Sequence, residues 1–303
     1  MGSVLLLLLF LLIGYTLQQR LTPHNQILWA DRLNRFVIYL SLPALVFVYM
    51  IDLELDSRFV LPISSAWGLF ILSALLILLL SKHFGWGRSL TGALLMVVPY
   101  GNTSFLGVPF TQAFFGKEGI PYAIIYDQLG SFLILSTLGL LTLSLYSGQQ
   151  AGAKEILYRI FTFPAFLALL SALPIQSSML PGWLMQMLGW LAATLTPAAL
   201  LSIGLYLKLR LERDKLLPFG IGLILKLIVT PLLLLLIFYL LDLEGLATEV
   251  SVFEAAMAPM VSSSMLAIMA GLERRFVASL LGYGIVISFV TLPLWFYLLK
   301  GVL

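Results

Sequence analysis

The sequence MVVPYGNTSFLGVP fills residues 96–109, in the middle of a stretch without charged residues between Arg88 and Lys117. It contains two prolines, two glycines and three consecutive hydrogen-bonding side chains. Pro109 has no N–H and its ring opposes the carbonyl of Phe105, so we expect the helical hydrogen-bond ladder to open there. An opened backbone is tolerated in a membrane only where it is buried in protein or lines an aqueous cavity. The stretch therefore predicts an interrupted helix inside a membrane protein.

The composition of the whole chain also indicates a membrane protein. Of its 303 residues, 61% are hydrophobic and only 10% are charged, whereas soluble domains carry about 25% charged residues. No core formed by this chain can hide so much apolar surface, so most of it must face lipid. We therefore expect an all-α polytopic protein of the cell (plasma or inner) membrane.

Ten membrane spans are predicted from the uncharged stretches between charged residues. The sixth and seventh share one uncharged run, which is divided by a turn-forming cluster from Pro174 to Gly182. A short segment rich in glycine and glutamine, residues 147–153, separates the fifth span from the sixth. The spans run over residues 3–18, 34–51, 60–81, 89–115, 120–146, 156–174, 182–207, 216–241, 250–271 and 275–299.

The lysine and arginine residues gather on one side of these ten spans. Of the 17, 13 fall on one side, 3 on the other, and Lys226 falls inside a span. By the positive-inside rule the side with 13 is cytoplasmic, so both termini are expected outside. The basic residues form no patch interleaved with aromatics, which argues against nucleic acid as a partner. The 13 are Arg20, Arg32, Arg35, Lys82, Arg88, Lys154, Arg159, Lys208, Arg210, Arg213, Lys215, Arg274 and Arg275.

A weak internal repeat relates the two halves of the chain. Pro-Ala-x-Leu or a close variant occurs at Pro43 in the second span and at Pro197 in the seventh. A polar break ends at Pro109 in the fourth span and another surrounds Pro259 in the ninth. Because five spans separate each pair, the halves must enter the membrane from opposite sides. We expect two inverted five-helix repeats, residues 1–150 and 151–303, with helices 4 and 9 broken; chance similarity is the alternative.

The two predicted breaks form the predicted site. If they meet near the midplane, the half-helix N-termini direct partial positive charge at the crossing point, which favours an anionic ligand. The alternative is an ordinary proline kink with serines bonded to their own backbone. The predicted helix-break residues are Gly101, Gly107, Pro109 and Pro259. The predicted substrate-binding residues are Asn102, Thr103, Ser104, Ser262, Ser263, Ser264 and Lys226.

Two charged residues fall inside predicted spans, Asp127 in the fifth and Lys226 in the eighth. An intramembrane charge costs several kcal/mol and is therefore a functional candidate that needs a partner. Asp127 and its neighbour Gln128 are the predicted site for a coupling ion, with a polar anchor between helices as the alternative. Lys226 is the predicted charge partner of an anionic substrate, with snorkelling to the cytoplasmic interface as the alternative. Glu254, near the outer start of the ninth span, is expected at the membrane interface.

Catalytic and metal-binding chemistry lack the residues they need. The chain has no cysteine, and its two histidines, His24 and His83, both lie in charged loop sequence. Thiolate metal sites, zinc sites of the HExxH kind and Ser-His-Asp catalysis are therefore not expected. We predict that the protein is not an enzyme and holds no cofactor or metal.

Several motifs resemble those of one known family. The chain resembles, over its whole length, the bacterial branch of the auxin efflux carrier (PIN-like) family. The motifs that carry the resemblance are residues 101–109, residues 126–131 and the pair Lys226 and Pro231. The resemblance implies a fold like that of bile-acid sodium symporters and sodium/proton antiporters, with an elevator-like scaffold domain and transport domain. It implies organic anions as cargo, auxin in plants and malate or malonate in some bacteria, with Asn102 contacting a substrate carboxylate. The long cytoplasmic loop of the plant members is absent from this chain.

The expected function is therefore a secondary carrier of a small organic anion, such as a carboxylate, by alternating access. The alternatives are an ion-coupled symporter or antiporter for another small solute and a transporter-like ligand sensor. A channel suits repeated midplane breaks less well. The expected partners are the anion, sodium or a proton in the coupled case, and the lipid bilayer; a homodimer is also allowed.

Overall fold

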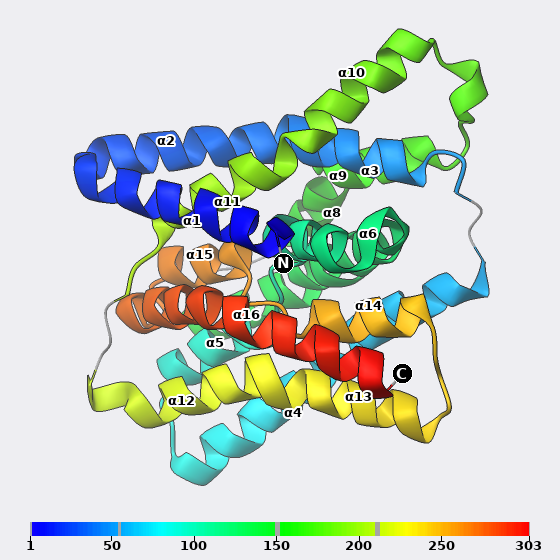
Figure 1. Cartoon of the computed structure of the whole chain (residues 1–303). Helices are drawn as coiled ribbons and strands as arrows, with labels where there is room; N and C mark the ends of the chain where they lie inside the picture. The colour runs from blue at the N-terminus through cyan, green and yellow to red at the C-terminus, as the bar shows by residue number, and fades with distance from the viewer. Residues whose placement is uncertain (1, 54–55, 149–151, 210–212, 303) are drawn as a thin grey trace. The chain divides into compact units, whose positions relative to one another are not determined.

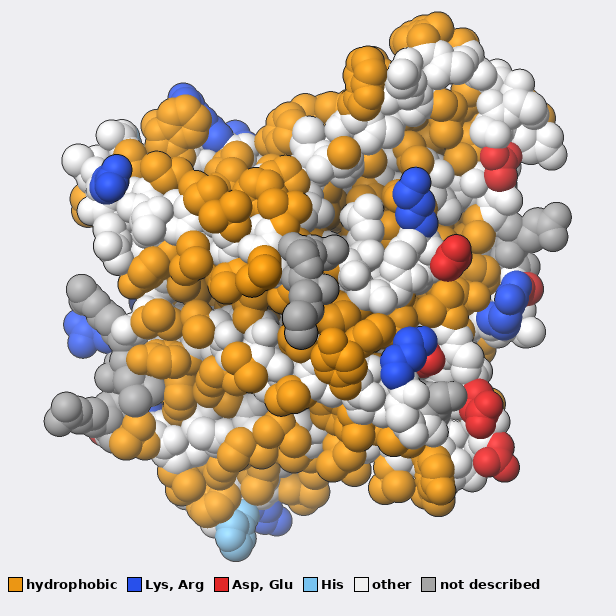
Figure 2. All heavy atoms as spheres, viewed as in Figure 1, with side chains coloured by type: hydrophobic (Ala, Val, Ile, Leu, Met, Phe, Trp, Pro, Cys, Tyr) orange, Lys and Arg blue, Asp and Glu red, His pale blue; other side chains and the backbone are white. Residues whose placement is uncertain are grey.

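The computed structural model describes residues 2–53, 56–148, 152–209 and 213–302, and every regular element within these ranges is helical. Six helical runs are long and apolar enough to cross a membrane, and a bent pair of helices, Lys154–Thr162 and Pro164–Ala172, makes a seventh if it is one span. Hydrophobic side chains cover much of the face shown in Figure 2. The all-helical class is confirmed and fits a polytopic membrane protein. Ten spans in an inverted repeat stay a prediction.

The chain forms two compact units, each built from segments before and after residue 150. The first comprises the described residues within 1–56, 104–124 and 158–207, and the second those within 57–103, 125–157 and 208–303. The predicted repeats, 1–150 and 151–303, are a division of the sequence that these units do not test. Figure 1 colours the chain by residue number, so that early and late segments can be told apart in each unit.

The elements have the following bounds. The first unit contains α1 (Gly2–Arg20), α2 (Pro23–Phe36), η1 (Val37–Ser41), α3 (Leu42–Met50), most of α6 (Val108–Ile125), α9 (Pro164–Ala172), η6 (Ser177–Met179), α10 (Gly182–Ala193) and α11 (Leu195–Tyr206). The second contains η2 (Ser57–Phe59), α4 (Val60–Phe84), α5 (Arg88–Val97), η4 (Tyr126–Phe132), η5 (Leu135–Gly139), α7 (Leu140–Ser147), η7 (Arg213–Lys215), α12 (Leu216–Ile224), η8 (Leu225–Val229), α13 (Thr230–Leu240), α14 (Leu246–Ala255), α15 (Val261–Met269) and α16 (Arg274–Val302). Three elements cross a boundary between the units, namely α6, η3 (Thr103–Gly107) and α8 (Ala153–Thr162).

Several helices differ from the predicted spans. The second span begins at Pro23 rather than at residue 34, because its charged residues lie along a helix instead of in a loop. The sixth is bent by 62° between α8 and α9, where Pro164 opens the second helix. Helix α14 begins at Leu246, four residues before the expected start of the ninth span, directly after Gly245 with φ of 101°.

Three π-helical turns stand directly before a proline. The turns η1, η3 and η8 end two residues before Pro43, Pro109 and Pro231 respectively. Proline has no N–H to give to the carbonyl four residues earlier, and its ring crowds that carbonyl. The wider π turn lets the backbone pass the proline without ending the helix. At these three prolines the helix therefore continues through a π turn instead of ending.

The first unit depends on a close contact between α1 and α11, which run side by side in Figure 1. A Cβ atom added at Gly204 of α11 would lie 2.7 Å from the backbone nitrogen of Tyr15 and 2.8 Å from the Cα of Gly14. Where the two backbones meet, only glycine fits. At Gly189 of α10, in contrast, an added Cβ would meet nothing within 4 Å.

We expect Gly204→Ala to lower the free energy of unfolding by about 1–3 kcal/mol, because the added methyl group forces two packed helices apart. The matched control is Gly189→Ala, which adds the same group to open space and favours helix slightly. Thermal unfolding of both purified variants in detergent checks the prediction. Equal unfolding temperatures for the two variants would contradict the close contact.

Candidate functional site

Two interrupted helices of the second unit meet through their backbones. The chain leaves helical conformation between α5 and η3, and again between α14 and α15. Gly101 and Pro259 form an antiparallel bridge, in which Asn102 donates its N–H to Ala258 at 2.8 Å and Met260 donates to Tyr100 at 3.1 Å. These two bonds lie on either side of Gly101 and Pro259, which are therefore a non-hydrogen-bonded pair. In such a pair neither residue donates its N–H to the other strand. Pro259 therefore sits where its missing donor costs nothing.

Two glycines make room for this crossing. A Cβ atom at Gly101 would lie 3.2 Å from the carbonyl oxygen of Glu254 and 3.3 Å from the Nζ of Lys226. A Cβ atom at Gly284 of α16 would lie 2.9 Å from the Cγ of Pro259. Gly284 therefore requires a residue without a side chain at this approach, and a side chain at Gly101 would crowd Glu254 and Lys226.

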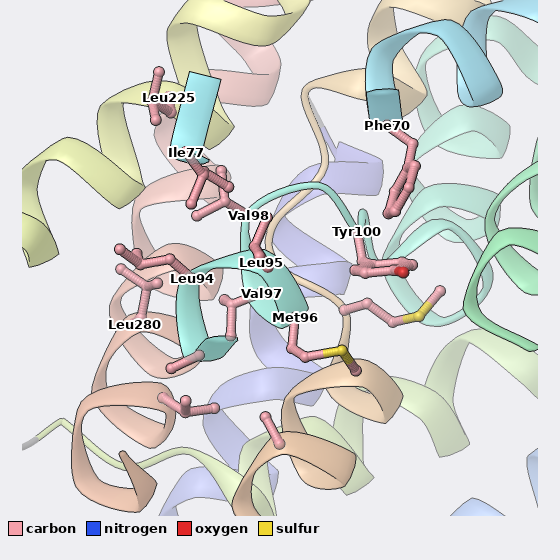
Figure 3. Packing of buried hydrophobic residues seen from close by; sticks show 14 of the residues in the cluster. Phe70, Ile77, Leu94, Leu95, Met96, Val97, Val98, Tyr100, Leu225 and Leu280 are labelled. Atoms are coloured by element: carbon pink, nitrogen blue, oxygen red, sulfur yellow. The ribbon is translucent and has the colours of Figure 1, made fainter. Parts of the chain in front are cut away.

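A hydrophobic cluster within the second unit anchors the α5 side of the crossing. Leu94, Val97 and Leu280 belong to it, together with Ile77 of α4 and Leu225 of η8, as Figure 3 shows. Tyr100 follows in the extended segment, and its ring packs against that of Phe70 with centroids 5.3 Å apart. Burial of these side chains fixes where α5 ends and where the extended segment begins.

The first break overlaps the predicted one but ends earlier. We expect the ladder to open at Phe105–Pro109 and Gly101 to belong to the break. The chain is non-helical at residues 98–102, which include Gly101, and the helix resumes at Thr103. Gly107 and Pro109 lie within helical structure, where the missing N–H of Pro109 produces the π turn η3 instead of a break. In the second interrupted helix, Pro259 lies in the extended stretch as expected.

Lys226 points into the protein from the π turn η8 and is 4% exposed. Its Nζ donates to the carbonyl of Ala255 at 3.2 Å, at the C-terminal end of α14, where the helix dipole is negative. It also interacts electrostatically with Glu254. The alternative of snorkelling to the cytoplasmic interface is therefore wrong. The ammonium group neutralises the broken end of α14.

The burial of Glu254 was not predicted. Glu254 is fully buried in the last turn of α14, whereas its place relative to the membrane interface stays a prediction. The sequence did contain a signal, because a buried Lys226 needs a counter-charge and Glu254 lies five residues before Pro259, where the helix breaks.

Asp127 and Gln128 lie in the π turn η4 and are buried. The Asp127 carboxylate accepts hydrogen bonds from the Thr103 hydroxyl and from Nε2 of Gln128 at 2.6 Å. Asp127 is thereby tied to the first residue of η3, immediately after the crossing. The second unit therefore brings Asp127 and Gln128 close to Asn102 and Thr103.

Two buried polar atoms next to these bonds have no hydrogen-bond partner within the described residues. They are Nδ2 of Asn102 and Oε1 of Gln128, on side chains that are 2% and 0% exposed. Nearly all buried polar atoms in proteins are satisfied, so an orphaned pair calls for a water, an ion or a ligand. Asn102 offers a donor and Gln128 an acceptor.

Two of the predicted serines bond to the backbone immediately before their own helix, α15. The Ser263 and Ser264 hydroxyl groups donate to the carbonyl of Met260 at 3.2 Å and 2.8 Å, which is the arrangement of an ordinary kink, and Ser262 is exposed. Ser104 belongs to the first unit and so is not placed with the crossing. The helix α15 nevertheless begins beside these serines, and the first N–H groups of a helix have no partner within it.

The polar groups at the crossing can bind a ligand. Within the described residues no group of three or more His, Cys, Asp or Glu is placed to hold a metal ion. In the part of the chain that the structure describes, the donors without a partner in the first segment are the Asn102 amide and the Tyr100 hydroxyl, and the N-terminus of α15 adds a helix end that favours negative charge. The buried charges Lys226 and Asp127 already have partners in the protein.

Comparison with known proteins places the chain in a family. A model of the family described as membrane transport protein matches residues 1–157 and 150–296. An uncharacterized transporter from Methanothermobacter thermautotrophicus is 33% identical over 301 residues, covering 97% of this chain and 98% of its own length. One from Methanocaldococcus jannaschii is 27% identical over 317 residues, covering 99% and 98%. The chain therefore belongs to the membrane transport protein family, that of the auxin efflux carriers and PIN-like transporters.

Proposed function

We propose that the protein is a secondary carrier that moves a small organic anion, such as a carboxylate, across the membrane by alternating access. The observation that carries the proposal is the buried, unpartnered Nδ2 of Asn102 in one of two extended segments bonded to each other inside interrupted helices. Extended backbone at membrane depth is characteristic of transporter sites.

In this proposal the anion binds to neutral donors. Asn102 gives one N–H, and the first turn of α15 gives backbone N–H groups together with the positive end of its dipole. Lys226 is engaged with Ala255 and Glu254, so it balances charge at the crossing instead of contacting the substrate. Neutral donors hold an anion without the strong attraction that would prevent its release.

The division of the chain into two compact units suits alternating access, which needs a substrate-bearing body distinct from a fixed one. The family supports transport as such. A channel would give flux that neither saturates nor responds to substrate on the far side. Saturable, exchange-stimulated flux is therefore part of the proposal.

A second candidate, coupling to a proton or sodium, is favoured by Asp127. Its buried carboxylate bonds to Thr103, next to Asn102. A buried acid so close to the proposed anion site can take up a cation when the anion arrives, and the paired charges cost less than either alone. A ligand sensor would bind the anion at the same donors and transport none of it.

Asn102→Ala is expected to raise the half-saturation concentration for carboxylate exchange by about tenfold to a hundredfold, the worth of one hydrogen bond to a charged group. Counterflow of labelled malonate or malate into proteoliposomes measures it. Asn25→Ala, at an exposed asparagine of α2, is the matched control and should exchange as the wild type does. Wild-type exchange by Asn102→Ala would contradict the site. Binding without counterflow in the wild type would favour the sensor.

Asp127→Asn is expected to abolish uphill uptake driven by a proton or sodium gradient while leaving equilibrium exchange intact, because the amide cannot bind either cation as a charge partner. Uptake and exchange are measured in the same proteoliposomes with and without the gradient. Asp242→Asn, in an exposed turn after α13, is the control. Gradient-driven accumulation at the wild-type level in Asp127→Asn would contradict coupling through this carboxylate.

A further inference from the structure

Two tryptophans in the second unit donate to backbone carbonyls of π turns. Nε1 of Trp67, on α4, bonds to the carbonyl of Leu129 in η4 at 2.9 Å. Nε1 of Trp295, on α16, bonds to the carbonyl of Leu227 in η8 at 2.9 Å. The site predicted from the sequence includes neither tryptophan. Both reach from a neighbouring helix to a turn that carries an intramembrane charge.

Each indole donates to a carbonyl that lacks its usual α-helical donor. In an α-helix the carbonyl of Leu227 would accept from residue 231, but that residue is Pro231, which has no N–H. The carbonyl of Leu129 would accept from Leu133, whose N–H instead bonds to Gly130. Without the indole donors, both carbonyls would lose a hydrogen bond. In lipid surroundings no water is available to replace it, so the free energy of the folded protein would rise.

The same two turns carry Asp127 and Lys226, each as the second residue of its turn. Asp127 bonds to Thr103, where η3 starts, and Lys226 bonds to Ala255, where α14 ends. A π turn holds one residue more than an α turn, so its loss would rotate the rest of the helix by about 100°. The direction of both charged side chains therefore depends on the turns staying as they are.

We infer that Trp67 and Trp295 are positioning residues, which hold the π turns η4 and η8 so that Asp127 and Lys226 reach the two ends of the crossing. Neither indole contacts the anion. The effect on transport rests on the proposed function, whereas the effect on the crossing itself does not. Replacing Trp295 tests the inference more strongly than replacing Trp67. The hydrogen bond of Trp295 is buried, and the π turn that it contacts is followed by Pro231.

The first experiment replaces each tryptophan by 3-benzothienylalanine, which keeps the ring shape and has sulfur in place of the N–H. We expect the half-saturation concentration of malonate counterflow to rise roughly threefold to tenfold at position 67 or 295, the worth of one hydrogen bond. The same replacement at Trp190, whose side chain is 68% exposed on α10, should change nothing. Wild-type half-saturation in both altered proteins would overturn the inference.

The second experiment does not need transport. Hydrogen exchange is compared between the wild type and the Trp295 replacement, in peptides covering residues 225–229 and 255–260. We expect faster exchange in both, because loss of the indole bond moves Lys226 away from the end of α14. Faster exchange in residues 225–229 alone, or in neither, overturns the positioning role. If the wild type exchanges no carboxylate, the proposed function fails and this measurement still decides the inference.

Discussion

Two backbone hydrogen bonds, between residues 100–102 and 258–260, are the constraint on which the rest of the second unit depends. A broken helix in lipid leaves polar groups that water cannot reach. Here two broken helices satisfy each other, and the pairing allows extended backbone inside an apolar protein. Gly101 and Gly284 let the segments approach, and Pro259 sits at the one position where its missing N–H is not needed.

The buried charges are a consequence of that crossing. Breaking α14 exposes its negative end, and Lys226 caps it through Ala255 with Glu254 beside it. Asp127 accepts a hydrogen bond from the hydroxyl of Thr103, the residue that follows the crossing. Lys226 lies at a helix end of opposite sign, which is where an intramembrane charge costs least. In the proposed site a substrate therefore binds to neutral donors. Such donors hold an anion weakly enough for it to be released.

The sequence predicted the helical class, the family and the presence of two breaks. These features depend on prolines and uncharged stretches, whose effects on the backbone involve only neighbouring residues. The predicted first break extends from Gly101 to Pro109, whereas the observed break covers residues 98–102, where Tyr100 and the α5 side chains are packed in the core. The burial of Glu254 was not predicted, because it depends on the tertiary packing around α14. The roles of Trp67 and Trp295 had no local signal, since each bond joins residues more than sixty positions apart.

The central claim is that the crossing binds a small organic anion, and ligand-induced stabilisation of the purified protein tests it most directly. A ligand that binds only the folded state at a hundredfold excess over its Kd adds about 2.7 kcal/mol of stability. The predicted result is a saturable rise in unfolding temperature with malonate, malate or another small carboxylate. The contradicting result is no rise with any carboxylate and a clear rise with a cationic or uncharged solute.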